Sequence, residues 1–165
     1  MKITPQKDIK NTFFKHILAF FVNEPSPILH ISGSAGSGCN QLIFSFMEWY
    51  LNQSSNKIFL LDTENAYSKR SLTGLKDFSE RLFLTHVNYT ENLYPFLDNL
   101  NNSSYLVSCG DLLIINSISN HLKRKFAKSY NYGDYQTIIH HCVEKTFPTI
   151  RKFLRENKTF LIIRH

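Results

Sequence analysis

Five short apolar runs, in which polar and apolar residues do not alternate, constrain the fold more than any other feature of this chain. Strands buried on both faces have such near-continuous apolar runs, whereas strands with one face in water alternate. Segments of helical spacing and turn residues separate the runs. An α/β fold is therefore predicted, with a mostly parallel sheet and helices on both of its faces. The runs are ILHIS (28–32), KIFLLD (57–62), RLFLTHV (81–87), DLLIINSI (111–118) and TFLIIRH (159–165).

Helices are expected between these strands. Apolar residues recur at helical spacing in residues 8–23 and 39–52. A polar helix is predicted at 68–80, a partly helical segment at 89–102, and a long helix at 135–157 with a kink at Pro148. The core-facing stripe expected on the long helix contains Ile138, Ile139, Cys142, Val143, Phe147, Ile150 and Leu154.

One domain accounts for the length of the chain. Its 165 residues, 42% of them hydrophobic, suffice for one sizeable core and leave no room for a second. We expect an N-terminal helix and linker at 1–27 and an α/β core at 28–165.

Charge and cysteine usage narrow the class of protein. A formal net charge of +6 favours contact with a polyanion such as nucleic acid. Three scattered cysteines, at 39, 109 and 142, form no CxxC pair, which predicts a reduced intracellular protein without disulfides or structural zinc. The polar start MKITPQKDIKN is unlike a secretory signal, and HILAFFV at 16–22 is too short to span a bilayer.

The first apolar run leads into GSAGSGCNQL at 33–42, whose first six residues we call the glycine loop. Gly33 and Gly38 keep the outer spacing of the phosphate-binding pattern GxxxxGK[ST], and Gly36 adds backbone freedom between them. In that pattern backbone N–H groups hold phosphates, lysine adds positive charge, and the hydroxyl residue ligates Mg²⁺. Here Cys39 and Asn40 occupy the last two positions, so the lysine and the hydroxyl are both missing.

A second part of such a site is altered as well. An apolar strand ending in an acidic residue normally places a carboxylate beside Mg²⁺. The fourth run ends instead at the neutral Asn116. Losses at both places predict a retired nucleotide site, and the alternative is a glycine-rich turn that binds nothing.

Four landmarks in order resemble those of the RecA-type recombinases of eukaryotes and archaea. Gln41–Leu42 after the glycine loop is similar to the QL of GKTQL, and LLDTENAY at 60–67 resembles the IDTEGTF segment. INSI at 115–118 resembles VDSI, and LIIRH at 161–165 resembles the terminal VVVTNH strand. Over residues 28–165 the chain is therefore identified as a divergent recombinase paralogue with a RecA-like core.

The resemblance assigns roles to individual residues. The vestigial nucleotide-binding positions are Gly33, Gly36, Gly38, Cys39, Asn40, Gln41 and Asn116. The water-activating glutamate of the family maps onto Glu64, which is retained but has little to act on without an ordered nucleotide and metal. No cofactor is therefore expected, and Mg-ATP would bind weakly at most.

The resemblance also implies the cellular process and the partners of this protein. The sequence stops before the family's last core strands, and residues before Ile28 do not hold the family's N-terminal DNA-binding domain. Short paralogues of this kind resemble subunits of fungal recombination-accessory assemblies of the Shu type. That implies a nuclear DNA-repair role exercised through sister paralogues in a hetero-oligomer.

Contact with DNA is predicted on separate grounds. The segment HLKRKFAKSYNYGDY at 121–135 carries basic residues that would contact phosphates and tyrosines that would stack on unpaired bases. The resembled family has its first DNA-binding loop at this place. The alternative is a solvated helix start. The candidate DNA-binding residues are Lys123, Arg124, Lys125, Lys128, Tyr130 and Tyr132.

Other residues are assigned packing roles. His140, His141 and Cys142 are adjacent and point in different directions on a helix, so no metal site is expected there. His30, inside an apolar run, is predicted to be a hydrogen-bonded core histidine. The aromatic residues of segment 8–23 form either a partner-binding surface or a capping helix.

Three functions remain open from the sequence. The first is a non-catalytic subunit of a recombination-repair assembly. The second is an ATPase or phosphotransferase whose missing lysine comes from Lys57 or from a neighbouring subunit. The third is a plain protein-interaction domain on an old nucleotide-binding scaffold.

Overall fold

Five parallel strands form one sheet in the order β1-β5-β4-β2-β3. The computed structural model describes residues 6–25, 27–34, 36–68, 72–87, 93–103, 106–118, 127 and 132–164. This sheet confirms the predicted α/β fold with parallel strands. The strands are β1 (Ile28–Ile31), β2 (Ile58–Asp62), β3 (Leu82–His86), β4 (Leu112–Asn116) and β5 (Phe160–Arg164).

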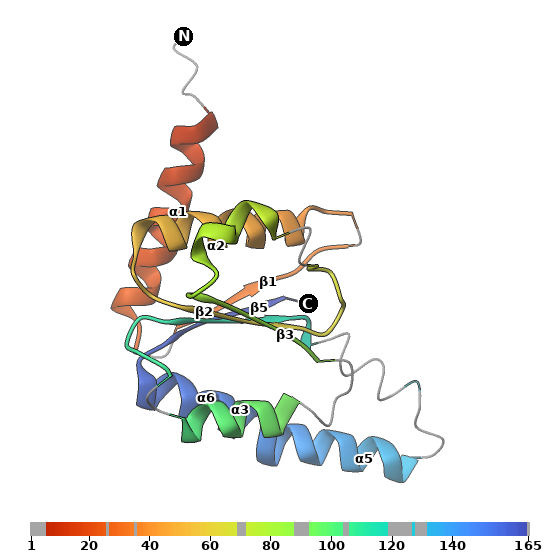
Figure 1. The fold of residues 1–165 in the computed structure, drawn as a ribbon. Helices are drawn as coiled ribbons and strands as arrows, with labels where there is room; N and C mark the ends of the chain where they lie inside the picture. Colours follow the sequence, from red (N-terminus) through yellow and green to blue (C-terminus); the bar gives the residue numbers. More distant parts are fainter. Residues whose placement is uncertain are drawn as a thin grey trace.

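Helices cover both faces of the sheet (Figure 1). One face carries α1 (Gln6–Asn23), α2 (Cys39–Gln53) and the short 3-10 helix η1 (Thr73–Phe78). The other carries α3 (Leu93–Asn102) and the continuous series α5 (Tyr132–His141), the π-helical turn η3 (Cys142–Thr146) and α6 (Phe147–Asn157).

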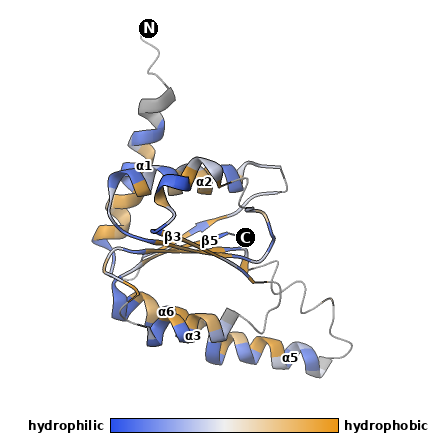
Figure 2. Ribbon diagram, viewed as in Figure 1, coloured by the Kyte–Doolittle hydropathy of each residue, from blue (hydrophilic) through white to orange (hydrophobic). Residues whose placement is uncertain are grey.

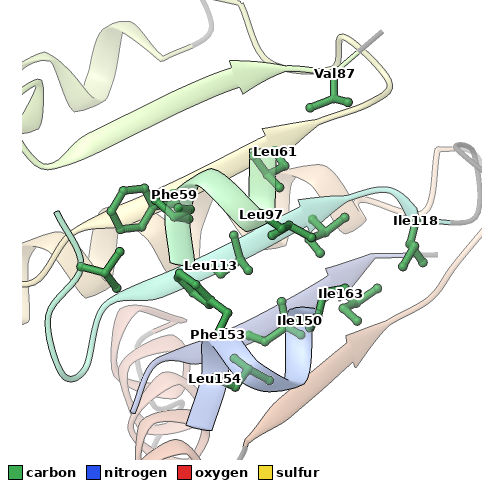
Figure 3. Close-up of a cluster of buried hydrophobic side chains, with 14 residues drawn as sticks. Phe59, Leu61, Val87, Leu97, Leu113, Ile118, Ile150, Phe153, Leu154 and Ile163 are labelled. Carbon is green, nitrogen blue, oxygen red and sulfur yellow. The ribbon is translucent and has the colours of Figure 1, made fainter. Parts of the chain in front are cut away.

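The sheet separates two apolar cores, which explains the burial of its strands. Every residue of β2 and β4 is buried, whereas the edge strands β1 and β3 keep exposed positions. Figure 2 shows the strands and the sheet-facing sides of the helices as the hydrophobic parts of the molecule. In Figure 3, Leu97 of α3 and Phe153 of α6 lie against Leu113 of β4. Central strands buried on both faces need apolar residues at every position, which is the pattern seen in the sequence.

Two local predictions were wrong. The polar helix expected at 68–80 is reduced to the 3-10 helix η1, and residues 69–71 of that segment lie outside the described residues. His30 is exposed rather than buried, because β1 is an edge strand and pairs only with β5 among the described strands. An apolar run alone does not distinguish an edge strand from a central one.

The long helix turns a different set of residues toward the core than the sequence predicted. Ile138, Ile150 and Leu154 are buried as expected. Three other members of the predicted stripe, Ile139, Val143 and Phe147, are exposed. The π-helical turn η3, in which the N–H of Phe147 donates to the carbonyl of Cys142 five residues back, changes the phase between α5 and α6. The buried side of α6 therefore does not continue the line of Ile139 and Val143. One extra residue in this turn rotates the following positions by about 100°. The turn directly precedes Pro148, which has no N–H for the regular ladder.

Within the part of the chain that the structure describes, no helix is long and apolar enough to cross a membrane.

Candidate functional site

The carboxyl ends of the five parallel strands meet at one edge of the sheet, which we call the carboxyl edge. Strand pairing places Asp62 beside Asn116, Asn116 beside Arg164, and Asp62 beside His86 on its other side. The glycine loop leaves β1 at the same edge. This is the position at which open α/β sheets bind ligands.

The glycine loop is a tight strand-to-helix connection. Gly36 and Gly38 have φ angles of 82° and 84°, a conformation that strains other residues, and Gly38 caps the start of α2. A Cβ atom on Gly33 would lie 2.4 Å from Oγ of Ser37 and 2.7 Å from Sγ of Cys39. The backbone conformation at Gly36 and Gly38 and the close contacts at Gly33 therefore explain the three glycines without a bound ligand. The side chains of Ser37 and Cys39, 3.1 Å apart, take up the space next to Gly33.

The first residues of α2 supply no charge to the loop. Cys39 carries a half-buried thiol. The backbone carbonyl of Asn40 accepts a hydrogen bond from the Tyr67 hydroxyl at 3.1 Å, while its side-chain Oδ1 is buried and has no donor among the described residues. Gln41 is exposed and lines, with Gly38 and Lys10, a groove of about 430 Å³ between α1 and α2.

Asp62 is fully buried, and its carboxylate is saturated by donors. It accepts hydrogen bonds from the backbone N–H of Tyr67 at 2.8 Å and of Glu64 at 3.1 Å. A third comes from the Asn116 side-chain amide at 3.3 Å. The imidazole Nδ1 of His86 lies 3.6 Å away. A buried carboxylate needs such donors, and here two of them are backbone N–H groups. Asp62 therefore holds the backbone that follows β2 in place.

Thr63 joins β2 to β4 beyond the regular strand pairing. Its backbone N–H donates to the carbonyl of Asn116 at 2.7 Å. Its hydroxyl donates to the carbonyl of Ser117 at 2.7 Å and accepts from the Ser117 N–H at 2.9 Å. The peptide bond between Asn116 and Ser117 is cis.

Glu64 is held by two partners on neighbouring strands. The Ser117 hydroxyl donates to Oε1 at 2.9 Å, and Nη1 of Arg164 forms an ion pair with Oε2. The side chains of Arg164 and Glu64 are 12% and 25% exposed. An ion pair so shielded from water is screened little by salt. Glu64, Ser117 and Arg164 therefore connect the ends of β2, β4 and β5.

Burial controls the protonation of Tyr67 at this edge. Burial raises the pKa of its phenol well above the ordinary range, and the nearby Asp62 carboxylate raises it further. Tyr67 therefore stays neutral and donates its proton to the Asn40 carbonyl.

Three buried polar atoms of the carboxyl edge have no hydrogen-bond partner among the residues that the structure describes. They are Oδ1 of Asn40, Oδ1 of Asn116 and Nε of Arg164. Orphaned buried atoms mark a place where water or another small polar molecule would be held.

The residues present do not fit Mg-ATP. Mg²⁺ is bound in such sites by carboxylate or hydroxyl oxygens, yet Asp62 is saturated by donors and Glu64 is paired with Arg164. Cys39 offers no charge for phosphates. Among the described residues, no three His, Cys, Asp or Glu side chains gather closely enough to hold a metal ion.

Lys57 does not replace the missing lysine. It precedes β2, at the opposite end of the strand from Asp62, and its ammonium donates to the Leu106 carbonyl at 2.7 Å. This part of the sequence-based ATPase hypothesis is wrong.

The structure thus brings the glycine loop, Glu64 and Asn116 to one edge of the sheet. The candidate DNA-binding residues 123–125, 128 and 130 lie outside the described residues, as do His165 and the side chain of Tyr132. Sequence reasoning missed the roles of Tyr67, Ser117 and His86, and it missed the pairing of Arg164 with Glu64. His86 and Arg164 end their strands and Ser117 directly follows β4, so the register of neighbouring parallel strands is the signal that places these three residues at one edge.

Compared with models of protein families and with curated proteins, the sequence gives no match.

Proposed function

We propose that this protein is a non-catalytic recombinase paralogue, a subunit of a nuclear homologous-recombination repair assembly that binds sister paralogues and DNA. The proposal rests on the order of four sequence landmarks and on the chemistry of the carboxyl edge. No ATP turnover is required of this subunit.

The observation that carries the non-catalytic role is the occupation of Glu64. A water-activating glutamate needs a free carboxylate aimed at an ordered nucleotide. Here both carboxylate oxygens are engaged, one by Ser117 and one by Arg164. Asn116 adds a neutral amide where the resembled family has a metal-binding carboxylate. The charged groups of the edge therefore satisfy one another.

The strand order supports the resemblance. Residues 33–42, 62–64, 115–118 and 161–164 are far apart in sequence, yet β1, β2, β4 and β5 bring their ends to one edge. A nucleotide-binding ancestor with these landmarks would need that arrangement. The retained geometry with altered charges is what a retired site would leave.

The binding of a partner is supported by the exposed side of α1. Phe14 and Phe21 of this helix are buried against the body, while Phe13 and Phe20 remain 50% and 40% exposed. Phe13 and Phe20 are seven residues apart and therefore lie on one side of the helix, and exposed aromatic residues are typical of an interface. The α1 aromatic face, defined by Phe13 and Phe20, is the surface we assign to a sister paralogue.

DNA contact is assigned to the basic segment 121–135 on sequence grounds. Its lysines, arginine and tyrosines suit phosphates and unpaired bases, and the net charge of +6 favours the approach of a polyanion.

Co-expression with recombinase paralogues from the same organism tests the proposal. We expect one of them to form a complex that survives gel filtration with light scattering. Phe13→Ser with Phe20→Ser should disrupt it, whereas Phe83→Ser on the exposed side of β3 should not. A chain that binds no paralogue, or that hydrolyses ATP alone and loses this activity in Glu64→Gln, would favour the ATPase alternative.

A further inference from the structure

A second cavity lies at the opposite end of the sheet. Its lining residues precede β1, β4 and β5 or belong to the last turns of α1, α2 and α6, so it opens at the amino ends of the strands. Its volume is about 770 Å³. We call it the amino-edge pocket. In Figure 1 this end of the sheet is where α1 finishes, away from the C-terminal label.

Apolar side chains make up most of the wall. Phe21 of α1 stacks on Phe160 of β5 with ring centroids 4.9 Å apart and an interplanar angle of 20°. Such stacking fixes both rings, so this side of the pocket is rigid. The apolar lining residues are Leu18, Phe21, Val22, Pro25, Pro27 and Phe160.

The floor is fixed by hydrogen bonds around Gly110. Its N–H donates to the Lys158 carbonyl at 3.0 Å, and its carbonyl accepts from the Tyr50 hydroxyl and, at 3.0 Å, from the Asn56 amide. Gly110 has a φ of 86°, and a Cβ there would lie 2.6 Å from Asn56 Nδ2. These bonds join the ends of α2 and α6 to the start of β4. The pocket is therefore formed before any ligand arrives.

Two cations and one carboxylate line this cavity. Arg155 and Lys158, near the end of α6, are both exposed, and neither forms an ion pair with a residue that the structure describes. Glu24 is the carboxylate among the described lining residues. The exposed thiol of Cys109 also borders the pocket. With Glu24 counted, the charged lining residues carry a net charge of +1. An apolar wall beside this charge is complementary to an apolar molecule that carries one negative charge.

We infer that the amino-edge pocket binds a small amphipathic carboxylate, with its apolar body against Phe21 and Phe160 and its carboxylate on Arg155 and Lys158. The volume lies within the roughly 300–1,000 Å³ of small-molecule sites. A guanidinium matches a carboxylate by two parallel hydrogen bonds, and the adjacent ammonium adds charge. The inference is independent of the proposed function, because the pocket and the carboxyl edge lie at opposite ends of the sheet.

The test compares three probes with the same ten-carbon chain: decanoate, decanol and decyltrimethylammonium. Each is titrated into the protein calorimetrically, below its own aggregation concentration. We expect decanoate to bind at least tenfold more tightly than the other two. Equal affinity for all three would mean that the pocket selects apolar surface only, as a groove for a protein partner would, and would overturn the inference.

Matched variants on one helix locate the site. Arg155→Gln with Lys158→Gln should lower the decanoate affinity at least tenfold. Arg151→Gln with Lys152→Gln removes the same charges from exposed positions of α6 outside the pocket and should leave the affinity unchanged. Equal effects of the two pairs would show general charge attraction and would contradict the assignment.

Alkylation of Cys109 gives a second readout. Bound decanoate should slow modification of Cys109 by iodoacetamide, followed by peptide mass spectrometry, while Cys142 on the far face of the sheet reacts at its usual rate. Thermal unfolding shows whether each variant is folded. Decanoate that binds without protecting Cys109 would place the ligand elsewhere and refute the proposal.

Discussion

At the scale of the residue, Asn116 is explained by its contact with Asp62. Its amide donates to the buried Asp62 carboxylate at 3.3 Å. A carboxylate at position 116 would face the Asp62 carboxylate, and Arg164, its neighbour in the sheet register, is already paired with Glu64. A neutral donor at this position therefore stabilises the carboxyl edge in the absence of metal.

Asn116→Asp should accordingly destabilise the protein. Two carboxylates this close in a buried site cannot both ionise at low cost, so the loss should be on the order of 2 kcal/mol or more at pH 7. One carboxyl of the pair would keep its proton in the folded state, so the loss should shrink as the pH falls from 7 to 5. Urea unfolding at both pH values measures this effect.

The charge-swapped variant Asn116→Asp with Asp62→Asn is the control. It restores one carboxylate and one amide, so it should recover part of the lost stability. Equal stability of wild type and Asn116→Asp at pH 7 would show that the edge already accommodates a second negative charge.

Tyr67 makes the stability of the protein dependent on alkaline pH. Burial, and next the Asp62 carboxylate, raise the pKa of Tyr67 above its ordinary value of 10.0. The folded state therefore retains the phenolic proton longer than the unfolded state does, and stability falls as the pH rises above about 10. The slope from one such group reaches about 1.4 kcal/mol per pH unit.

Tyr67→Phe should flatten this alkaline decline. At pH 7 the variant loses the hydrogen bond to Asn40, about 1 kcal/mol, and by pH 11 the difference from wild type should be smaller. Tyr50→Phe should act in the same direction, since burial raises the pKa of Tyr50 too. Chemical unfolding between pH 7 and pH 11 measures the free energy of unfolding of wild type and both variants. The same pH dependence in all three would show that neither tyrosine causes the alkaline loss of stability.

At the scale of the element, the sequence predicts the strands well and the helical phase poorly. Buried strands such as β2 and β4 are apolar at every position, a local signal that needs no knowledge of neighbours. The π-helical turn η3 lies where α3 packs against η3 and α6, and this packing is a tertiary property. The loop geometry and Asn116 were predictable from motif spacing. The pairing of Glu64 with Arg164 was not, since 100 residues separate them.

Replacing isoleucine by alanine at two positions tests which residues of the long helix face the core. Ile150→Ala removes a side chain that is 3% exposed and should cost about 2–5 kcal/mol. Ile139→Ala trims a side chain that is 48% exposed and should change stability by no more than about 0.5 kcal/mol. Urea unfolding of both variants measures the difference. Similar losses at the two sites would mean that Ile139 belongs to the core and that η3 does not shift the stripe.

The basic segment 121–135 is tested by the salt dependence of DNA binding in the partner-bound complex. Alanine at Lys123, Arg124, Lys125 and Lys128 removes up to four phosphate contacts. The slope of log affinity against log salt should fall by about 0.7 on single strands, and by about 0.9 on duplex, for each phosphate that is no longer neutralised. Phenylalanine at Tyr130 and Tyr132 keeps the stacking faces and serves as the control, whereas alanine there should weaken single-strand binding most.

An unchanged slope in the four-alanine complex, with an unchanged melting temperature, would assign DNA contact to the partner. The segment would then be a solvated surface.

At the scale of the whole molecule, the two ends of the sheet have different chemistry. At the carboxyl edge, the carboxylates of Asp62 and Glu64 are engaged by donors of the protein itself. The amino edge holds a preformed pocket with two exposed cations. The α1 aromatic face lies on a third surface. Among the described residues of the carboxyl edge, Glu64 is engaged by Ser117 and Arg164.

We propose that the carboxylates of the carboxyl edge are engaged by the protein itself and hold no nucleotide. Thermal unfolding with and without Mg-ATP measures whether a nucleotide binds. A ligand at about 100 times its Kd stabilises the folded state by about 2.7 kcal/mol, a shift of several degrees in Tm. We expect no shift in Tm with millimolar Mg-ATP and no turnover, for the chain alone or in its complex. A Tm that rises with Mg-ATP, together with hydrolysis that Glu64→Gln abolishes, would contradict the proposal.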